Sequence, residues 1–290
     1  MPCLYSCLQI RTFHLGQGVI FLEIISLVAV FSLLLVALIF SPLGLGGGVL
    51  YVPIIYYLLD WDIQDAVVAS LSLVLMVALG SSLAHSKDGY ADNKVANIGR
   101  ITAIPAAILG TYISGYFILS VGEIGIKILA ALIIAFVFER TIRRMISGDG
   151  AGEEEISIST KTNQYRLGAA FAGTSAGMLG IGGGAILVTL NRSLLKMDAN
   201  KAAGTSYLIS TTIVPVALLS HIILDKNIGQ MIETIGILPI IIIPLMAFLS
   251  AFFGAKYAIK HIPKSAVTIV FLCAISLSLL RYIVDFVSYI

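Results

Sequence analysis

Long apolar runs separated by short polar connections dominate the hydropathy pattern of this chain. Residues 19–59 contain one charged side chain, Glu23. Several runs reach the roughly 18 to 20 residues that an α-helix needs to cross about 30 Å of hydrocarbon. The pattern therefore predicts an all-α, polytopic membrane protein. The comparable runs are residues 66–84, 101–121, 128–138, 167–190, 202–224, 235–255 and 266–280.

Composition supports this prediction and argues against two other classes of protein. Hydrophobic residues make up 58% of the chain and charged residues 12%, and the mean hydropathy is +1.00. A soluble domain carries about 25% charged residues, and a soluble helical core would need charged outer faces at helical spacing, which are missing. The Lys and Arg residues lie in short connections rather than on one face, so we expect no nucleic-acid partner.

The N-terminal region is expected to be a tail over residues 1–18, followed by a membrane span. Arg11 and His14 precede the first apolar run, as in a signal peptide. The run is too long for a signal peptide and no small-x-small cleavage site follows, so we expect an uncleaved first span. The three cysteines lack the spacing of metal ligands, and we expect no metal and no cofactor.

The two halves of the chain share an ordered set of residues. Residues 44–48, Gly-Leu-Gly-Gly-Gly, recur as Gly-Ile-Gly-Gly-Gly at 180–184, an offset of 136. We infer two related transmembrane repeats, 19–144 and 165–290, joined by a cytoplasmic linker at 145–164. The other matches are Asp62 with Asp198, Ser70 with Ser206 and His85 with His221 at the same offset, and Pro105 with Pro244 and Gly115 with Gly254 at an offset of 139.

The positive-inside rule indicates that these repeats are inverted. Basic residues place the linker in the cytoplasm, and Lys87, Lys94 and Arg100 place the connection after the 62–85 helix there too. The equivalent connection of the second repeat, 225–230, has one Lys offset by one Asp and is predicted to lie outside. Equivalent connections on opposite sides of the membrane are expected of inverted rather than parallel repeats.

Each repeat carries a glycine cluster inside an apolar run. Glycine costs about 1 kcal/mol per residue in a helix interior, so three or four together are expected to interrupt the helix. The segments that begin at Val49 and Ala185 would start short helices whose free N–H groups and positive dipole ends face the break. That geometry suits a small anion, and a paired break in two repeats points to a transporter's binding site.

Two alternatives for the glycine clusters stay open at this point. The glycines could serve close helix packing alone, as small residues do in membrane bundles. The second cluster also lies in a stretch of about 29 residues, 167–195, which is too short for two full crossings at 1.5 Å per residue. This stretch is either one broken crossing or a re-entrant hairpin, and the parity of the spans favours the hairpin.

These motifs together resemble the sulfite exporter TauE/SafE family of membrane transporters. The similarity lies in the GxGGG at 44–48 followed by Val52-Pro53, in Ala202-Ala-Gly-Thr-Ser206, and in His85 and His221 near the ends of equivalent helices. It covers nearly the whole chain. The resemblance implies a carrier of sulfite, organosulfonates or related small anions, without fixing the substrate or the direction of transport.

The two halves depart from each other inside these motifs. The second half has Val188-Thr189 where the first has Val52-Pro53, and the first has Val-Ala-Ser at 68–70 where the second has Gly-Thr-Ser at 204–206. The two halves are therefore not expected to be equivalent binding shells. The second half has more hydroxyl groups to offer a substrate.

The resulting hypothesis is a secondary transporter in the cell membrane that works by alternating access, with a small anion and the lipid bilayer as partners. We expect His85 and His221 either to cap helix ends or lie at the membrane interface, or to act in proton coupling or gating. Association into a homo-oligomer is left open. The expected substrate contacts are backbone donors at Gly46, Gly47, Gly48, Gly182, Gly183 and Gly184, and hydroxyl groups of Ser70, Thr205 and Ser206.

Three other functions are weighed against this one. An anion channel would also use broken helices. Residues 173–177, Gly-Thr-Ser-Ala-Gly, match the G-x-S-x-G of serine hydrolases with Ser175 as nucleophile, but without the strand-to-helix context. A cation exchanger would need carboxylates in mid-span, whereas Glu23 has no repeat partner, and Asp62 and Asp198 are expected to cap helix N-termini.

Overall fold

Helices account for the regular structure of the described residues, in which no strand occurs. The computed structural model describes residues 24–146, 154–224 and 228–288, so the expected tail and Glu23 lie outside it. The described part of the first helix covers residues 24–40 and ends in a 3-10 turn, η1 (Ser41–Leu43). The other helices are α2 (Gly48–Leu58), α3 (Ile63–Lys87), α4 (Asn93–Val121), α5 (Glu123–Ile146), α6 (Ile158–Leu179), α7 (Gly184–Leu194), α8 (Ala199–Leu224), α9 (Ile228–Ile235), α10 (Ile237–His261) and α11 (Lys264–Ser288).

The glycine clusters form the tips of two helical hairpins. After the second cluster, α7 folds back along α6, since the Tyr165 hydroxyl of α6 donates a hydrogen bond of 2.7 Å to Asn191 Oδ1 of α7. In the first repeat, a Cβ added to Gly47 would lie 2.9 Å from a methyl carbon of Val36 in the first helix. The chain therefore turns back at both glycine clusters, and of the two arrangements left open for residues 167–195, the structure has the hairpin.

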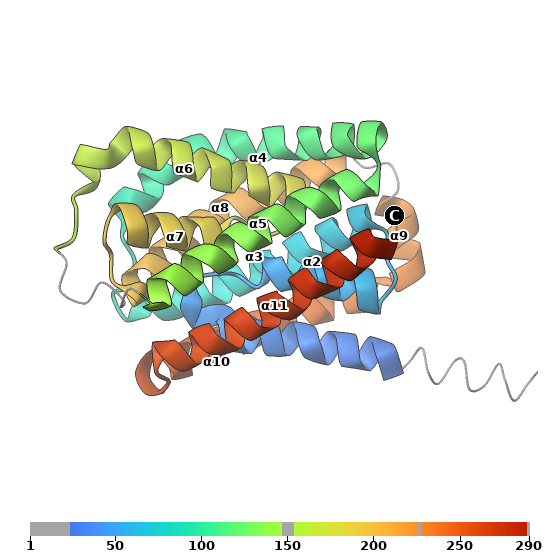
Figure 1. The fold of residues 1–290 in the computed structure, drawn as a ribbon. Coiled ribbons are helices and arrows are strands. Elements are labelled where there is room, and N and C mark those ends of the chain that lie inside the picture. The colour runs from blue at the N-terminus through green and yellow to red at the C-terminus, as the bar shows by residue number, and fades with distance from the viewer. Residues whose placement is uncertain (1–23, 147–153, 225–227, 289–290) are drawn as a thin grey trace, which may run out of the picture.

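Helices α3 and α8 lie side by side at the centre and run antiparallel. The rings of His85, near the end of α3, and Tyr207, near the start of α8, have centroids 5.7 Å apart. Helices α4 and α6 pack on one side of this pair, and α10 and the first helix pack on the other (Figure 1). Helices α5 and α11 pack against each other, and they contact α7 and α2 respectively.

The surface of the bundle is apolar, as lipid requires. Leu119, Leu167 and Ile223 are each at least 75% exposed, whereas many serines and threonines are buried. Charged side chains in α5, and charged and uncharged polar side chains in α6, make these two helices less apolar than the other long helices. Six helices of the described chain are long and apolar enough to cross a membrane: Ile24–Leu43, Ile63–Lys87, Asn93–Val121, Ala199–Leu224, Ile237–His261 and Ser265–Val287.

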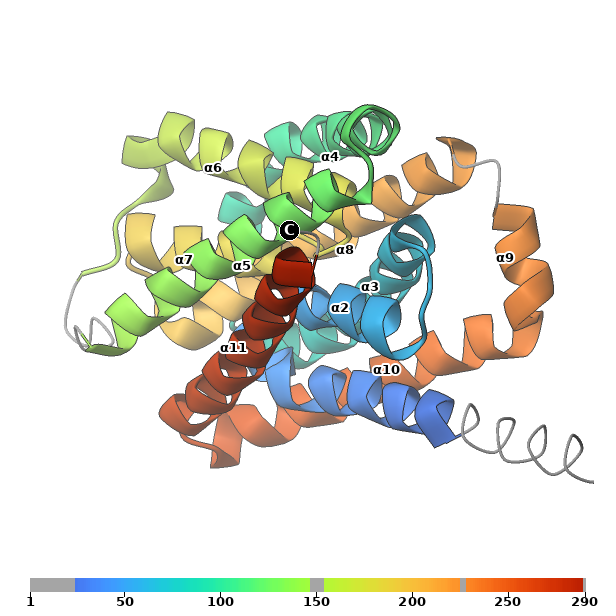
Figure 2. The ribbon, with the colours of Figure 1, turned by 45° about the vertical axis from the view of Figure 1, so that its right-hand side comes forward.

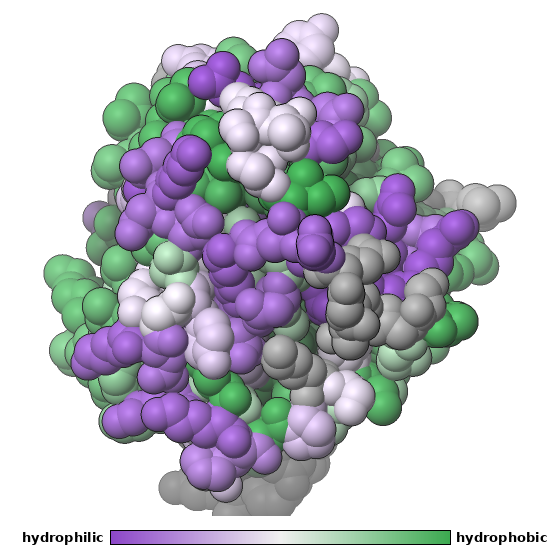
Figure 3. Space-filling view, turned by 90° about the vertical axis from the view of Figure 1, so that its left-hand side faces the viewer, coloured by the Kyte–Doolittle hydropathy of each residue, from purple (hydrophilic) through white to green (hydrophobic). Residues whose placement is uncertain are grey.

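Polar connections gather at one end of the bundle, which we call the basic end. It contains the α3–α4 and α10–α11 connections and the starts of α6 and α8. Ion pairs join these segments, with Lys260 Nζ 3.7 Å from Asp88 Oδ1 and Lys201 Nζ 2.6 Å from Glu155 Oε1. Figure 3 shows hydrophilic residues across this end and apolar residues around its edge. Helix α9, between α8 and α10, lies at the opposite end (Figure 2).

The helices extend into both ends of the predicted linker, 145–164. Helix α5 continues to Ile146, and α6 begins at Ile158. Ile158 is buried, and the N–H group of Ile156 donates to the carbonyl of Leu195 at 2.9 Å. The polar segment predicted to be a linker therefore contains the first turns of α6, because the buried Ile158 anchors this helix to the core.

Candidate functional site

Two buried glycine loops, residues 44–47 and 180–183, connect the arms of the hairpins. The backbone φ angles are 79°, 73° and 78° at Gly44, Gly46 and Gly47. At the equivalent glycines 180, 182 and 183 they are 69°, 71° and 70°. Residues other than glycine rarely adopt positive φ. The repeated glycines therefore encode the same backbone path twice.

The glycine loops pack directly against each other. A Cβ added to Gly48 would lie 2.6 Å from the carbonyl oxygen of Ile181, and one added to Gly184 would lie 2.8 Å from that of Gly44. Val74, about halfway along α3, would collide with a Cβ on Gly182. The structure thus brings Gly46–Gly48 and Gly182–Gly184 together near the middle of the central helices, as the hypothesis of one shared site requires.

Serine side chains of α3 and α8 hold the carbonyl groups around these loops. Ser70 Oγ donates to the Gly180 carbonyl at 2.8 Å, and Ser206 Oγ lies 3.1 Å from both the Gly44 and the Gly184 carbonyl oxygens. The matched serines therefore each bind the other repeat's loop. Ser210, which the repeat comparison does not identify, donates to the Gly182 carbonyl at 3.3 Å.

The short helices α2 and α7 begin at the glycine loops. Their N-cap residues, Gly47 and Gly183, provide no side-chain cap. Bonds of 2.9 Å from Leu50 N–H to the Gly47 carbonyl and 3.0 Å from Leu187 N–H to the Gly183 carbonyl close the first turns. The preceding amides have no acceptor within their own helix. The positive ends of two helix dipoles therefore lie where the loops meet, which favours negative charge, and the Gly46 N–H group there donates to the Tyr207 hydroxyl at 3.4 Å.

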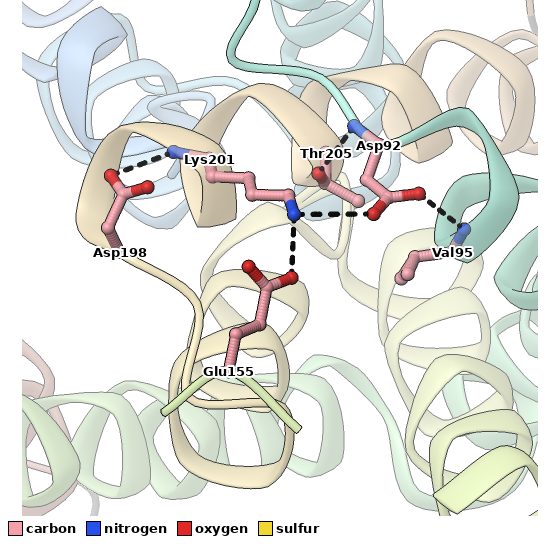
Figure 4. Close-up of polar contacts among 6 residues, drawn as sticks. All are labelled: Asp92, Val95, Glu155, Asp198, Lys201 and Thr205. Carbon is pink, nitrogen blue, oxygen red and sulfur yellow. Dashed lines mark hydrogen bonds and ion pairs between the residues drawn. The ribbon is translucent and has the colours of Figure 1, made fainter. Parts of the chain in front are cut away.

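Thr205 lies away from this convergence, although the sequence places it beside Ser206. Its hydroxyl accepts a 3.1 Å hydrogen bond from the N–H group of Asp92. Figure 4 shows it in a polar cluster at the basic end, where the Lys201 amine lies 3.5 Å from Asp92 and 2.6 Å from Glu155. This cluster ties together the starts of α4 and α8 and the segment before α6. In the described structure, the hydrogen bond of the Thr205 hydroxyl is therefore to Asp92 at the basic end and not to a glycine loop.

Asp198 and Asp62 occupy similar positions but differ in their contacts. Asp198 Oδ1 accepts from the N–H groups of Asn200 at 2.8 Å and Lys201 at 3.2 Å, at the start of α8, as the capping interpretation expects (Figure 4). Asp62 is the N-cap residue of α3, but its side chain makes no capping hydrogen bond.

The two matched histidines lie near the ends of α3 and α8. His85 is fully buried, with Nδ1 2.9 Å from the Ser81 carbonyl, and its Nε2 has no hydrogen-bond partner among the described residues. His221 Nε2 is 2.6 Å from the Gly177 carbonyl. Because α3 and α8 are antiparallel, the two rings lie toward opposite ends of the bundle. Their role in coupling or gating stays a prediction.

Ser175 sits within the regular helix α6. Its hydroxyl donates to the Phe171 carbonyl at 2.9 Å. A Cβ on Gly173 or Gly177 would collide with backbone carbonyls of α4, at Ala103 or Ala107. The two glycines of the G-x-S-x-G match therefore allow α4 and α6 to approach closely, and the strained turn that exposes a hydrolase serine does not occur here.

A pocket of about 180 Å³ lies beside the first glycine loop. Helices α5, α7, α8, α10 and α11 surround it together with η1 and Leu45 of the loop. The repeat comparison does not identify this pocket, because its walls come from helices far apart in the sequence. Its polar lining residues are Thr141, Arg144, Thr189, Arg192, Asn200, Ser265 and Thr268.

Comparisons with known proteins agree with this architecture. "Probable membrane transporter protein YunE" of Bacillus subtilis (strain 168) is 29% identical in an alignment of 203 residues, and the match covers 63% of this chain and 73% of that protein. No solved structure gives a significant match. The family profile described as "Sulfite exporter TauE/SafE" matches residues 29–282. The match covers most of the 290 residues, so this chain belongs to the sulfite exporter TauE/SafE family and is a multi-pass membrane transporter.

Proposed function

We propose that this transporter moves a small anion, sulfite or an organosulfur anion, across the cell membrane by alternating access between two inverted repeats. The observation that carries the proposal is the meeting of the two glycine loops at the starts of α2 and α7. An anion held there would be bound by backbone N–H groups and by two helix dipoles, without a buried counter-charge.

The packing of the helices supports the inverted arrangement. Equivalent helices α3 and α8 run antiparallel, and the contact of α5 with α7 has its counterpart in the contact of α11 with α2. Ser70 and Ser206 bind the opposite repeat's loop in the same way. A site shared by two such repeats can be exposed to either side by moving one repeat against the other.

A flux assay in proteoliposomes tests the proposal. Sulfite, sulfate, a sulfonate and an organic carboxylate are each supplied to the purified protein, with and without a proton gradient. We expect saturable flux of a sulfur oxyanion and little flux of the carboxylate. Flux that does not saturate, at channel rates, would favour an anion channel, and the absence of any anion flux would contradict the proposal.

Replacing Ser206 by Ala tests whether the loops take part. The change removes the hydroxyl group between the Gly44 and Gly184 carbonyls, at about 1 kcal/mol for a lost buried hydrogen bond. We expect Ser206→Ala to lower the flux severalfold. Ser220→Ala is the matched control, since that hydroxyl on the same helix donates only within α8, to the Val216 carbonyl at 2.8 Å. Equal flux in both variants would argue against the loops as the site.

A further inference from the structure

Two arginine side chains are among the described residues that line the pocket at the basic end. Arg144, near the end of α5, and Arg192, near the end of α7, both line it. No Asp or Glu is among its described lining residues. Four hydroxyl groups and the amide of Asn200 add hydrogen-bonding capacity to an otherwise apolar wall. Guanidinium groups and hydroxyls in an apolar recess are suited to bind oxyanions.

This pocket reaches from the basic end to the first glycine loop. Leu43 and Leu45, on either side of Gly44, form part of its lining, and Val188 of α7 lies opposite them. A Cβ on Gly44 would lie 2.5 Å from a methyl carbon of Val188. An anion in the pocket would therefore be separated from the glycine loop by a thin apolar layer.

The equivalent place at the opposite end of the bundle can be located from the repeats. Arg144 is as many residues from the start of α5 as Asp285 is from the start of α11. Lys127 of α5 and Thr268 of α11 correspond in the same way. The offset of 136 pairs Arg192 with Tyr56. Residues that line the pocket at one end thus correspond to Asp285, Lys127 and Tyr56 at the other.

At that opposite end the corresponding side chains contact one another. Lys127 is 1% exposed, and its amine lies 2.9 Å from Asp285 Oδ2 and 4.5 Å from the centre of the Tyr56 ring. Tyr57 donates to Asp285 Oδ2 at 3.2 Å, and Tyr56 donates to Glu123 Oε2 at 3.3 Å. This cluster joins α2, α5 and α11, so the counterpart of the pocket is filled by side chains.

We propose that the basic-end pocket is an anion-binding vestibule that is open in this conformation, with Arg144 and Arg192 as the cationic contacts, while the cluster around Lys127 and Asp285 closes the opposite end. The inference rests on the proposed anion transport, and it adds a second binding position and its side-chain ligands. An oxyanion would be bound first by the arginines and then passed to the backbone donors of the glycine loops.

Thiol chemistry tests the vestibule without measuring transport. The protein is purified with its three cysteines replaced by serine and with Ser265→Cys, which puts one thiol on the pocket wall. Its rate of reaction is measured with an anionic and with a cationic methanethiosulfonate reagent. We expect the ratio of anionic to cationic rates to fall roughly tenfold when Arg144→Gln and Arg192→Gln are combined, because cations in a recess concentrate anions.

Matched variants separate the vestibule from a general effect of charge. Arg143→Gln removes the same charge one residue away, from an exposed side chain that pairs with Glu139, and should leave the rate ratio unchanged. Arg192→Lys in place of Arg192→Gln keeps the positive charge, so it should largely restore the ratio of anionic to cationic rates. An unchanged ratio in the double variant, or an equal fall with Arg143→Gln, would overturn the vestibule even if the transporter carries anions. A specific fall would support it even if the flux assay found no anion flux.

Discussion

Glycine residues at the loops are required for two separate physical reasons. Gly46 and Gly182 have positive φ, which costs an L-residue roughly 1–2 kcal/mol. Gly48 and Gly184 have no such restriction, but the opposite loop's carbonyl oxygens leave no room for a side chain. One motif therefore specifies both the turn of each hairpin and the contact between the two hairpins.

Replacing Gly48 by Ala should separate these requirements. The new methyl group would lie 2.6 Å from the Ile181 carbonyl oxygen, so the loops must move apart. We expect a lower thermal midpoint in detergent and the loss of most anion flux. Gly115→Ala on α4 is the control, because a Cβ there meets nothing within 4 Å and alanine favours a helix. A Gly48→Ala protein with the stability and flux of the control would show that the loop contact is dispensable.

Some residues at the loops could be predicted from the sequence and others could not. Ser70 and Ser206 could be predicted because the repeat pairs them, whereas Ser210 corresponds to Val74 and gives no repeat signal. The sequence also predicts Thr205, next to Ser206, as a hydroxyl contact of the substrate. Adjacent residues on an α-helix point about 100° apart, so the two hydroxyls face different partners: Thr205 faces Asp92 and Ser206 faces the loops.

At the scale of the elements, hydropathy and glycine spacing predict most of the fold. The matched prolines Pro105 and Pro244 do lie inside equivalent helices, α4 and α10. The pairing of α5 with α11 could not be predicted, because it depends on contacts between the ends of the two repeats. Lys127 in an apolar run gives no sign of its partner, since Asp285 lies 158 positions further along the chain.

The Lys127–Asp285 ion pair should be the main polar tie between α5 and α11. Removing one partner of a buried pair leaves an uncompensated charge, at a cost of about 3–5 kcal/mol. We therefore expect Asp285→Asn to lower the thermal midpoint strongly. Combining Lys127→Met with Asp285→Asn should restore part of the loss, because no isolated charge then remains buried. Additive effects of the two changes would show that the pair contributes no coupling.

At the scale of the whole molecule, charged residues gather at the basic end of the bundle, and the sides of the bundle are apolar. The α3–α4 and α10–α11 connections share the basic end with the starts of α6 and α8, while α9 lies at the other end (Figures 2 and 3). The positive-inside rule then predicts that the basic end faces the cytoplasm. With that orientation, the proposed vestibule would open toward the cytoplasm.

This orientation, and with it the inversion of the repeats, can be tested by thiol accessibility in cells. On the cysteine-free protein, Ser86→Cys labels the end of α3 and Gly229→Cys labels α9, which follows the equivalent helix α8. Both positions are exposed. A membrane-impermeant maleimide should modify Gly229→Cys in intact cells and Ser86→Cys only in inverted vesicles. Denatured samples of both variants, labelled in full, control for intrinsic reactivity. Modification of both thiols from the same side would mean that equivalent helices end on one face, which parallel repeats allow and inverted repeats do not.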